Sequence, residues 1–263
     1  MIFRVQEGYN RVDMKLYIYP NLTEERYIEK VKKALEVLKG KGHECILNKE
    51  DGHTLYGEES FDRGSIDDCD LIVSLGGDGT FLRGNIEAVR YDKPICGINC
   101  GNVGYLCACQ LKDIEDLDLD SLQETEVSML EMEYEGKTYY ILNEVIIGKD
   151  YFGGTVELEY EIGPKTDRFR GDGMILCTAT GSTAYNYSAG GEIFKDEDRL
   201  IGITPICAHN RHAKPFRIDE SESIRVRLLN PKYSATIYAD GIVIGPMTEI
   251  FVRSGRKKAR VLK

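Results

Sequence analysis

Residues 71–82 read LIVSLGGDGTFL, in which the apolar run Leu71–Leu75 leads directly into the turn Gly76-Gly77-Asp78-Gly79-Thr80. A short apolar run of this kind predicts a buried strand, and we expect a helix after Thr80. The turn therefore connects the end of a strand to the start of a helix, and α/β proteins bind phosphates at such connections. Glycines let backbone N–H groups approach an anion closely, and the helix dipole favours negative charge at this end.

Asp78 is the unusual residue of this turn, because a carboxylate repels phosphate. It is useful there if it binds Mg²⁺ or accepts the proton of an attacking hydroxyl, and both roles belong to phosphoryl transfer. The alternative is that Asp78 only caps a helix that begins at Thr80. Three glycines around one acid favour the functional interpretation. The turn has neither the Gly-x-Gly-x-x-Gly pattern nor the Gly-Lys-Ser/Thr ending of other nucleotide-binding loops.

Strands and helices alternate on both sides of this turn. We expect a strand at 15–19, a helix capped by Thr23 and stopped by Gly40 and Gly42, a strand around 45–47, a polar loop through Gly64, and a strand at 94–98. This order predicts a Rossmann-like α/β domain with a parallel sheet over residues 1–112, with the chain end, 247–263, as a candidate return to it. Asp78 then lies at the carboxyl edge of the sheet.

The pattern changes after about residue 125. Apolar and charged residues alternate over 156–162 and 224–228, and Glu135-Gly136-Lys137 is a hairpin signal. We therefore expect an antiparallel all-β domain over 113–246. The acidic stretch 113–120 reads as a linker with a short helix.

Composition narrows the possible functions. The chain has 263 residues, 42% of them hydrophobic, a net charge of −10 and a pI near 5.1, which argues against a nucleic-acid surface. No apolar run approaches the roughly 18 residues of a membrane span, and the first residues lack a signal-peptide core. The eight cysteines include no Cys-x-x-Cys pair. We expect a cytoplasmic protein with reduced thiols and no membrane partner.

A second stretch, residues 171–191, reads GDGMILCTATGSTAYNYSAGG. It predicts a strand that ends in a tight turn of small and hydroxyl-bearing residues. Its hydroxyl groups suit ribose and amide groups, and Tyr185 can offer a ring face or a phenol to a nucleotide.

With both stretches in view, the chain resembles the NAD kinase family. The resemblance runs from about residue 70 to 245 through GGDGTFL (76–82), GINCGNVGYL (97–106), LNE (142–144), TGSTAY (180–185), TPI (204–206) and DG (240–241). The first motif is shared with phosphofructokinases and diacylglycerol-type lipid kinases. The whole ordered set is much more specific.

The resemblance implies an enzyme that phosphorylates the 2′-hydroxyl of the adenosine ribose of NAD, making NADP, from ATP or polyphosphate and with a divalent metal such as Mg²⁺. Asp78 would be the general base, and Gly76, Gly77, Gly79 and Thr80 would form the phosphate loop. No protein side chain is assigned to the metal. The implied substrate-binding residues are Gly79, Tyr105, Asn143, Glu144, Asp172, Thr180, Thr183, Ala184, Tyr185, Ser188, Ile206 and Asp240. The site would span both domains, and the family implies a homodimer or homotetramer.

Three positions depart from the family pattern, because Ala179, Glu192 and Ala208 stand where prolines are usual. Glu192 would add a charge near an anionic substrate. Two other functions compete with NAD phosphorylation. A lipid kinase would share the glycine loop but need an apolar groove for acyl chains, and an NAD-binding sensor would have lost catalysis.

Overall fold

The computed structural model describes residues 14–57, 61–101, 104–151, 153–209, 213–230 and 232–263. The chain divides into two compact units, each described here by itself. The first comprises the residues up to Gly84, with 93–123 and 262–263, and the second comprises 85–92 and 124–261. Helix α3 (Asp78–Arg90) contributes its first half to the first unit and its second half to the second.

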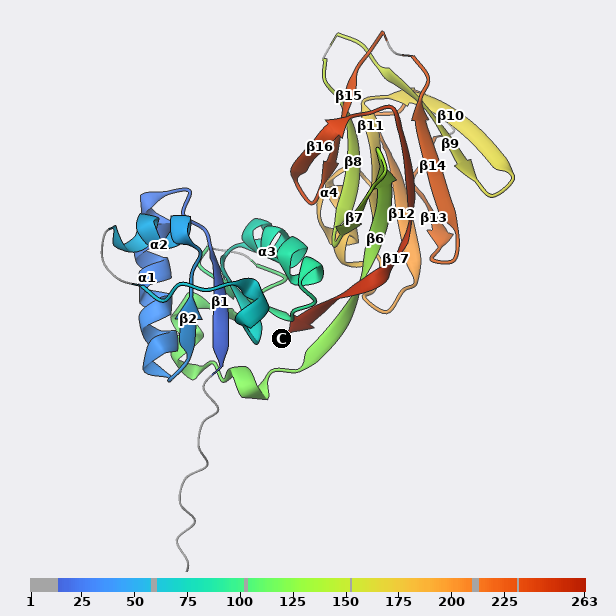
Figure 1. The fold of residues 1–263 in the computed structure, drawn as a ribbon. Coiled ribbons are helices and arrows are strands. Elements are labelled where there is room, and N and C mark those ends of the chain that lie inside the picture. Colours follow the sequence, from blue (N-terminus) through green and yellow to red (C-terminus); the bar gives the residue numbers. More distant parts are fainter. Residues whose placement is uncertain (1–13, 58–60, 102–103, 152, 210–212, 231) are drawn as a thin grey trace, which may run out of the picture. The chain divides into compact units, whose positions relative to one another are not determined.

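The first unit is a parallel sheet with helices, as the alternating pattern predicts (Figure 1). Its strands lie in the order β4-β3-β1-β2, and the two-residue β5 pairs with β4. The bounds are β1 Lys15–Pro20, α1 Glu25–Gly40, β2 Glu44–Ile46, α2 Lys49–Tyr56, β3 Leu71–Gly76, β4 Ile95–Asn99 and β5 Cys109–Gln110. All six residues of β3 are buried, because α1 and the neighbouring strands enclose it in one apolar core.

Three local expectations for this unit were wrong. Helix α3 begins at Asp78 rather than after Thr80. Helix α1 begins at Glu25, because the amide and hydroxyl of Thr23 both donate to the side chain of Asn21 instead of capping the helix. Helix α2 occupies part of the expected polar loop.

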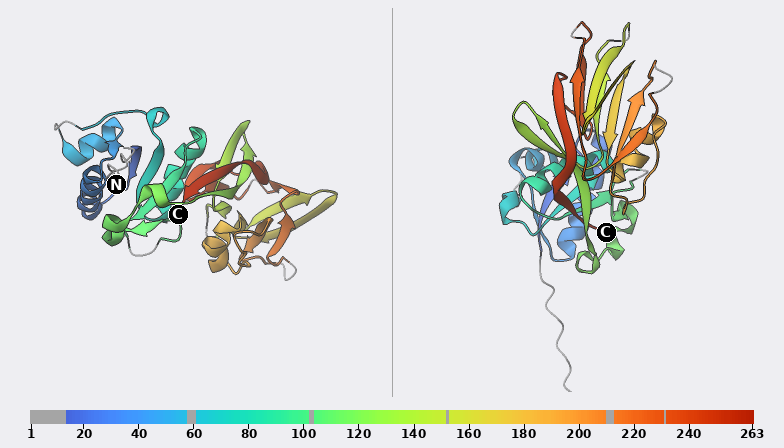
Figure 2. Two further views of the ribbon diagram at one scale, coloured as in Figure 1. Left: turned by 90° about the horizontal axis from the view of Figure 1, so that it is seen from below. Right: turned by 90° about the vertical axis from the view of Figure 1, so that its right-hand side faces the viewer.

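The second unit is an antiparallel β structure, as expected (Figure 2). One sheet has the order β13-β12-β11-β8-β15-β16, and a second group has the order β10-β9-β14-β17, with β6 paired to both β17 and β7. The strands are β6 Glu124–Tyr134, β7 Lys137–Ile141, β8 Glu144–Lys149, β9 Val156–Ile162, β10 Lys165–Gly171, β11 Gly173–Cys177, β12 Leu200–Ile206, β13 Phe216–Asp219, β14 Ser223–Leu228, β15 Ala235–Ala239, β16 Ile242–Pro246 and β17 Glu249–Leu262. Apolar side chains from both groups form one core, which explains the alternation along β9 and β14.

Two tight hairpins matter for the site. The β6–β7 turn has Glu135 at φ 48° and Gly136 at φ 71°, as the Glu-Gly-Lys signal predicts. The β15–β16 turn has the same form, with Asp240 at φ 47° and Gly241 at φ 77°. Between β11 and β12, Thr180–Thr183 form a 3-10 turn and Tyr185–Ser188 form the short helix α4.

The acidic stretch between the domains is folded as short 3-10 turns, Leu111–Asp116 and Leu119–Ser121. Among the residues that the structure describes, no helix is both long enough and apolar enough to cross a membrane.

Candidate functional site

Asp78 is the first residue of α3, and its carboxylate is held by the chain rather than by its own helix. One carboxylate oxygen accepts the backbone N–H of Tyr105 and the other accepts that of Leu106, each at 3.1 Å. The side chain therefore does not cap α3, and the capping interpretation is wrong. Each carboxylate oxygen has a second lone pair, so the fixed carboxylate can still accept a proton from a ligand.

The glycines of this loop differ in how much space surrounds them. A Cβ on Gly76 would lie 2.2 Å from the hydroxyl of Thr80, so this glycine permits close packing. A Cβ on Gly77 would meet nothing within 4 Å, and one on Gly79 would meet only the end of Arg83, at 4.0 Å. The loop is therefore open at Gly77 and Gly79, and the first N–H groups of a helix have no partner within the helix, so an anion can bind at this end of α3. Thr80 itself is buried.

Asn99 is a polar residue of this unit that the sequence analysis did not single out. It ends β4 opposite Gly76 of β3. Its side-chain oxygen accepts the N–H of Gly101 at 2.8 Å, while its side-chain nitrogen is buried and has no hydrogen-bond partner among the described residues. A polar side chain at the carboxyl end of a buried parallel strand was the available signal.

Asn143 and Glu144 come together at the start of β8 in the second unit. Both are buried, and within the described chain neither the Asn143 Oδ1 nor the Glu144 Oε2 atom has a hydrogen-bond partner. Burial first, and the nearby carboxylate of Asp240 second, raise the pKa of Glu144 to about 7. Buried acceptors without partners are costly unless a ligand satisfies them, which makes this pair a strong candidate for binding.

Asp240 holds the backbone that presents these two residues. Its carboxylate accepts the N–H groups of Leu142 and Asn143 at 2.8 Å and that of Glu144 at 3.2 Å. Burial raises its pKa to about 6, and these three hydrogen bonds act in the opposite direction. In the structure Asp240 is thus a positioning residue for the 142–144 segment.

The segment after β11 packs on the same backbone. The hydroxyl of Thr178 donates to the carbonyl of Leu142 at 2.6 Å and accepts the N–H of Gly181 at 3.0 Å. A Cβ on Gly181 would lie 2.1 Å from the carbonyl oxygen of Asn143, so only glycine fits there. Thr178, which was not among the expected site residues, therefore ties the two motifs together.

The hydroxyl-bearing residues of the second motif have two different roles. Ser182 is buried, donates to the carbonyl of Ala179 and accepts the N–H of Phe194, so it is structural. The outward residues are more accessible: Tyr185 is 44% exposed, and Thr183 and Ser188 are also exposed. Thr180 and Ala184 lie between these extremes. In the first unit, Tyr105 is 79% exposed.

Asp172 and Ile206 lie at the other end of β11. Asp172 immediately precedes this strand and Thr178 immediately follows it, which separates them by about 20 Å at the strand rise of roughly 3.3 Å per residue. The Asp172 amide donates to the carbonyl of Ile206, and its carboxylate pairs with Lys149 at 2.6 Å. The structure therefore does not bring these two residues to the Asn143–Glu144 pair.

The structure shows the surroundings of Glu192 and Ala179, two of the positions where the family usually has proline. Glu192 pairs with Arg217 at 2.7 Å, so its charge is partly neutralised. Ala179 has φ −58°, a value that proline also adopts, and it packs in a small apolar cluster with Ile175, Cys177 and Phe194.

Comparison with known proteins gives one consistent result. The model of the ATP-NAD kinase N-terminal domain matches residues 13–126, and that of the ATP-NAD kinase C-terminal domain matches residues 142–263. The NAD kinase of Syntrophotalea carbinolica is 33% identical over 219 residues, covering 78% of this chain and 76% of that protein. The NAD kinase of Natranaerobius thermophilus is 29% identical over 262 residues, covering 94% and 91%.

Solved structures agree with this result. An NAD kinase from Archaeoglobus fulgidus in complex with ATP has a TM-score of 0.75 and 25% identity, covering 95% of this chain and 93% of that one. Yeast NADH kinase complexed with NADH has a TM-score of 0.80, covering 96% and 84%; at 21% identity it supports the fold alone.

Proposed function

The chain belongs to the NAD kinase family, and we propose that it transfers a phosphoryl group from ATP or polyphosphate to the 2′-hydroxyl of the adenosine ribose of NAD, producing NADP. The observation that carries the proposal is the Asp78 carboxylate, held by two backbone amides at the head of α3 beside glycine positions that are open to a ligand. The family match over both domains argues against a lipid kinase, and the retained Asp78 argues against a binding-only sensor.

In this proposal Asp78 is the general base. The 2′-hydroxyl oxygen forms a bond to the terminal phosphorus of the donor while its proton passes to the Asp78 carboxylate, and the bond to the leaving phosphate oxygen breaks. The products from ATP are NADP and ADP. Phosphoryl transfer depends mainly on positioning and charge neutralisation, so a base fixed by two hydrogen bonds is well suited to it.

The phosphate chain would be bound by the amides at the start of α3. No atom crowds the chain at Gly77, and only the end of Arg83 comes near Gly79, while Gly76 packs closely against Thr80. Among the described residues no group of three or more His, Cys, Asp or Glu side chains could hold a metal. Mg²⁺ commonly needs only one or two carboxylates together with substrate phosphates, so it would be held here mainly by the phosphates of the donor and would neutralise their charge.

The adenosine part of NAD would be bound by the second unit. Asn143 Oδ1 and Glu144 Oε2 are the buried acceptors that a ribose hydroxyl or an adenine amine would satisfy. Within this unit, further contacts are assigned to Thr180, Thr183, Ala184, Tyr185 and Ser188, with Asp240 holding the 142–144 segment in place.

Asp172 and Ile206 need a separate assignment, because they lie at the opposite end of β11. If the protein is a homodimer or homotetramer, these residues can serve the dinucleotide bound by another copy. Mixing Asp78→Asn protein with Asp172→Ala protein tests this assignment. Mixed oligomers would regain activity that neither variant has alone, whereas no recovery would contradict the assignment of Asp172 to the dinucleotide bound by another copy.

The central test is NADP formation from NAD, ATP and Mg²⁺, followed through an NADP-specific dehydrogenase. Asp78→Asn should lower turnover by about 10²–10⁴, the usual loss for a general base, while NAD binding remains. Asp113→Asn, on an exposed aspartate, is the matched control and should be fully active. Equal turnover of wild type and Asp78→Asn would refute the assignment of the base.

A further inference from the structure

Arg83 of helix α3 has no part in the phosphoryl transfer described above, although it lies beside the glycine loop. It comes four residues after Gly79, so the two residues share one face of the helix. A long side chain on a helix points back towards the N-terminus. In the structure the Arg83 Nη1 atom accordingly lies 4.0 Å from the position of a Cβ on Gly79. The guanidinium is therefore next to the residue that follows Asp78.

The Arg83 guanidinium is available to a ligand. The side chain is exposed, and it has neither a hydrogen bond nor an ion pair with any other residue that the structure describes. Two other cations of this unit act on the backbone instead: Lys30 donates to the carbonyl of Cys100 at 2.6 Å, and Lys263 donates to that of Tyr105 at 3.3 Å. Arg83 thus differs from them in being a cation beside the loop whose N–H donors are unused by the described chain.

A phosphate donor needs a full positive charge at this loop. It brings several negative charges to a place that already holds the Asp78 carboxylate, in a chain whose net charge is −10. The amides at the start of α3 offer only partial positive charge. During phosphoryl transfer, negative charge spreads over the oxygens of the transferred group, and the planar guanidinium of an arginine can bind two of these oxygens at once.

From this placement we infer that Arg83 binds the terminal phosphate of the donor and neutralises the charge that develops on it during transfer. It acts there together with Asp78, which takes the proton of the attacking hydroxyl. The inference rests on the proposed function, because it takes the ligand of the loop to be a phosphate chain. The contact involves no nucleoside, so ATP and polyphosphate would use Arg83 in the same way.

The first test measures binding of inorganic tripolyphosphate to the full-length protein by isothermal titration calorimetry in the presence of Mg²⁺. Tripolyphosphate has the phosphate chain that both donors share, and it lacks the nucleoside. Arg83→Gln should weaken its binding about 10–100-fold, the usual effect of losing a hydrogen bond between charged groups. Arg83→Lys should weaken binding less, because an ammonium keeps the charge but loses the two-pronged geometry.

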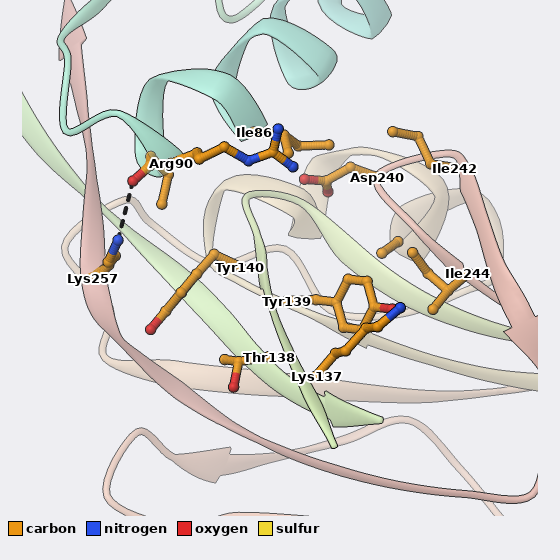
Figure 3. A pocket seen from close by; sticks show the side chains of 12 residues that line it. Ile86, Arg90, Lys137, Thr138, Tyr139, Tyr140, Asp240, Ile242, Ile244 and Lys257 are labelled. Carbon is orange, nitrogen blue, oxygen red and sulfur yellow. Dashed lines mark hydrogen bonds between the residues drawn. The ribbon is translucent and has the colours of Figure 1, made fainter. Parts of the chain in front are cut away.

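Arg90→Gln is the matched control. Arg90 lies in the last turn of the same helix, where it lines a different cavity (Figure 3) and pairs with Glu87 at 3.1 Å. This variant removes the same charge from α3, so it should bind tripolyphosphate like wild type if position decides the effect. Arg83→Gln should unfold at the same urea concentration as wild type, because Arg83 has no partner to lose within the described chain.

The second test repeats the NADP assay with the same variants. Arg83→Gln should lower kcat/KM for ATP about 10–100-fold and leave the KM for NAD unchanged, because its contact is with the donor alone. The inference is overturned if wild type does not bind tripolyphosphate, if Arg83→Gln binds it or uses ATP as well as wild type does, or if Arg90→Gln loses as much affinity. Wild type that binds tripolyphosphate through Arg83 but forms no NADP would refute the proposed function alone.

Discussion

Replacing Glu144 by Gln should make the protein more stable at alkaline pH and lower its affinity for NAD. Glu144 is 7% exposed, and burial raises its pKa from 4.5 to about 7. A carboxylate whose pKa is higher in the folded state binds protons more tightly there, so its ionisation destabilises the fold as pH rises from about 4.5 to about 7. Glutamine has nearly the same shape and does not ionise.

The size of the effect follows from the change in pKa. A rise from 4.5 to about 7 corresponds to roughly 3 kcal/mol between the two protonation states, at about 1.4 kcal/mol per pKa unit. Because the amide also loses an acceptor, we expect Glu144→Gln to be about 1–3 kcal/mol more stable than wild type at pH 8. The difference should shrink as pH falls and should vanish near pH 4.5.

Urea denaturation followed by circular dichroism from pH 5 to 8 measures this difference. Circular dichroism is the suitable probe because the chain has 16 tyrosines and no tryptophan. Glu197→Gln, on an exposed glutamate, is the matched control and should track wild type. A stability difference that does not change with pH would show that Glu144 ionises like a surface carboxylate. Unchanged NAD affinity of Glu144→Gln would show that Glu144 does not bind NAD.

The other predictions concern backbone packing and charge burial. Gly181→Ala should cost at least about 2 kcal/mol and raise the KM for NAD, because its Cβ would strike the carbonyl of Asn143; Gly40→Ala, with no atom within 4 Å, is the control. Thr178→Val should cost about 1–3 kcal/mol in urea denaturation, because two buried hydrogen bonds are lost, and a loss below about 0.5 kcal/mol would contradict this role. Glu131→Gln should destabilise the protein by about 1–3 kcal/mol at pH 7, because Arg253 and Arg256 lose their charged hydrogen-bond partner while themselves staying accessible to water. Hydrogen bonds from those arginines lower the pKa of Glu131 to about 2, so its stabilisation should be lost as pH falls from about 4.5 towards 2; thermal unfolding at pH 7 and pH 3 tests both statements.

The error at α2 has a tertiary cause as well as a local one. Helix α2 carries Gly52 in its middle, and a glycine in a polar segment reads as a loop. In the structure a Cβ on Gly52 would lie 1.9 Å from the ring of Phe61, so the glycine makes room for an aromatic side chain. Asn48 caps the helix by accepting the N–H of Asp51, a signal that was present in the sequence.

The two site motifs were found for different reasons. The glycine turn around Asp78 could be located from sequence because its position depends on local order, a buried strand followed by a helix. The residues of the second motif were named together, yet Asp172 lies at the far end of β11 from Thr180. Sequence proximity cannot show this separation, because an extended strand carries neighbouring residues far apart.

The two fold classes and the location of the glycine turn could be predicted from the sequence alone, which also carries the motifs of the family. Periodicity and glycine placement act over a few residues, so they can be read directly. The contacts of the key carboxylates, in contrast, depend on how distant parts of the chain pack. Asp78 meets amides 27 and 28 residues away, and Asp240 meets amides 96 to 98 residues away. Such bonds form because packing brings distant segments together, and no local pattern encodes the partner.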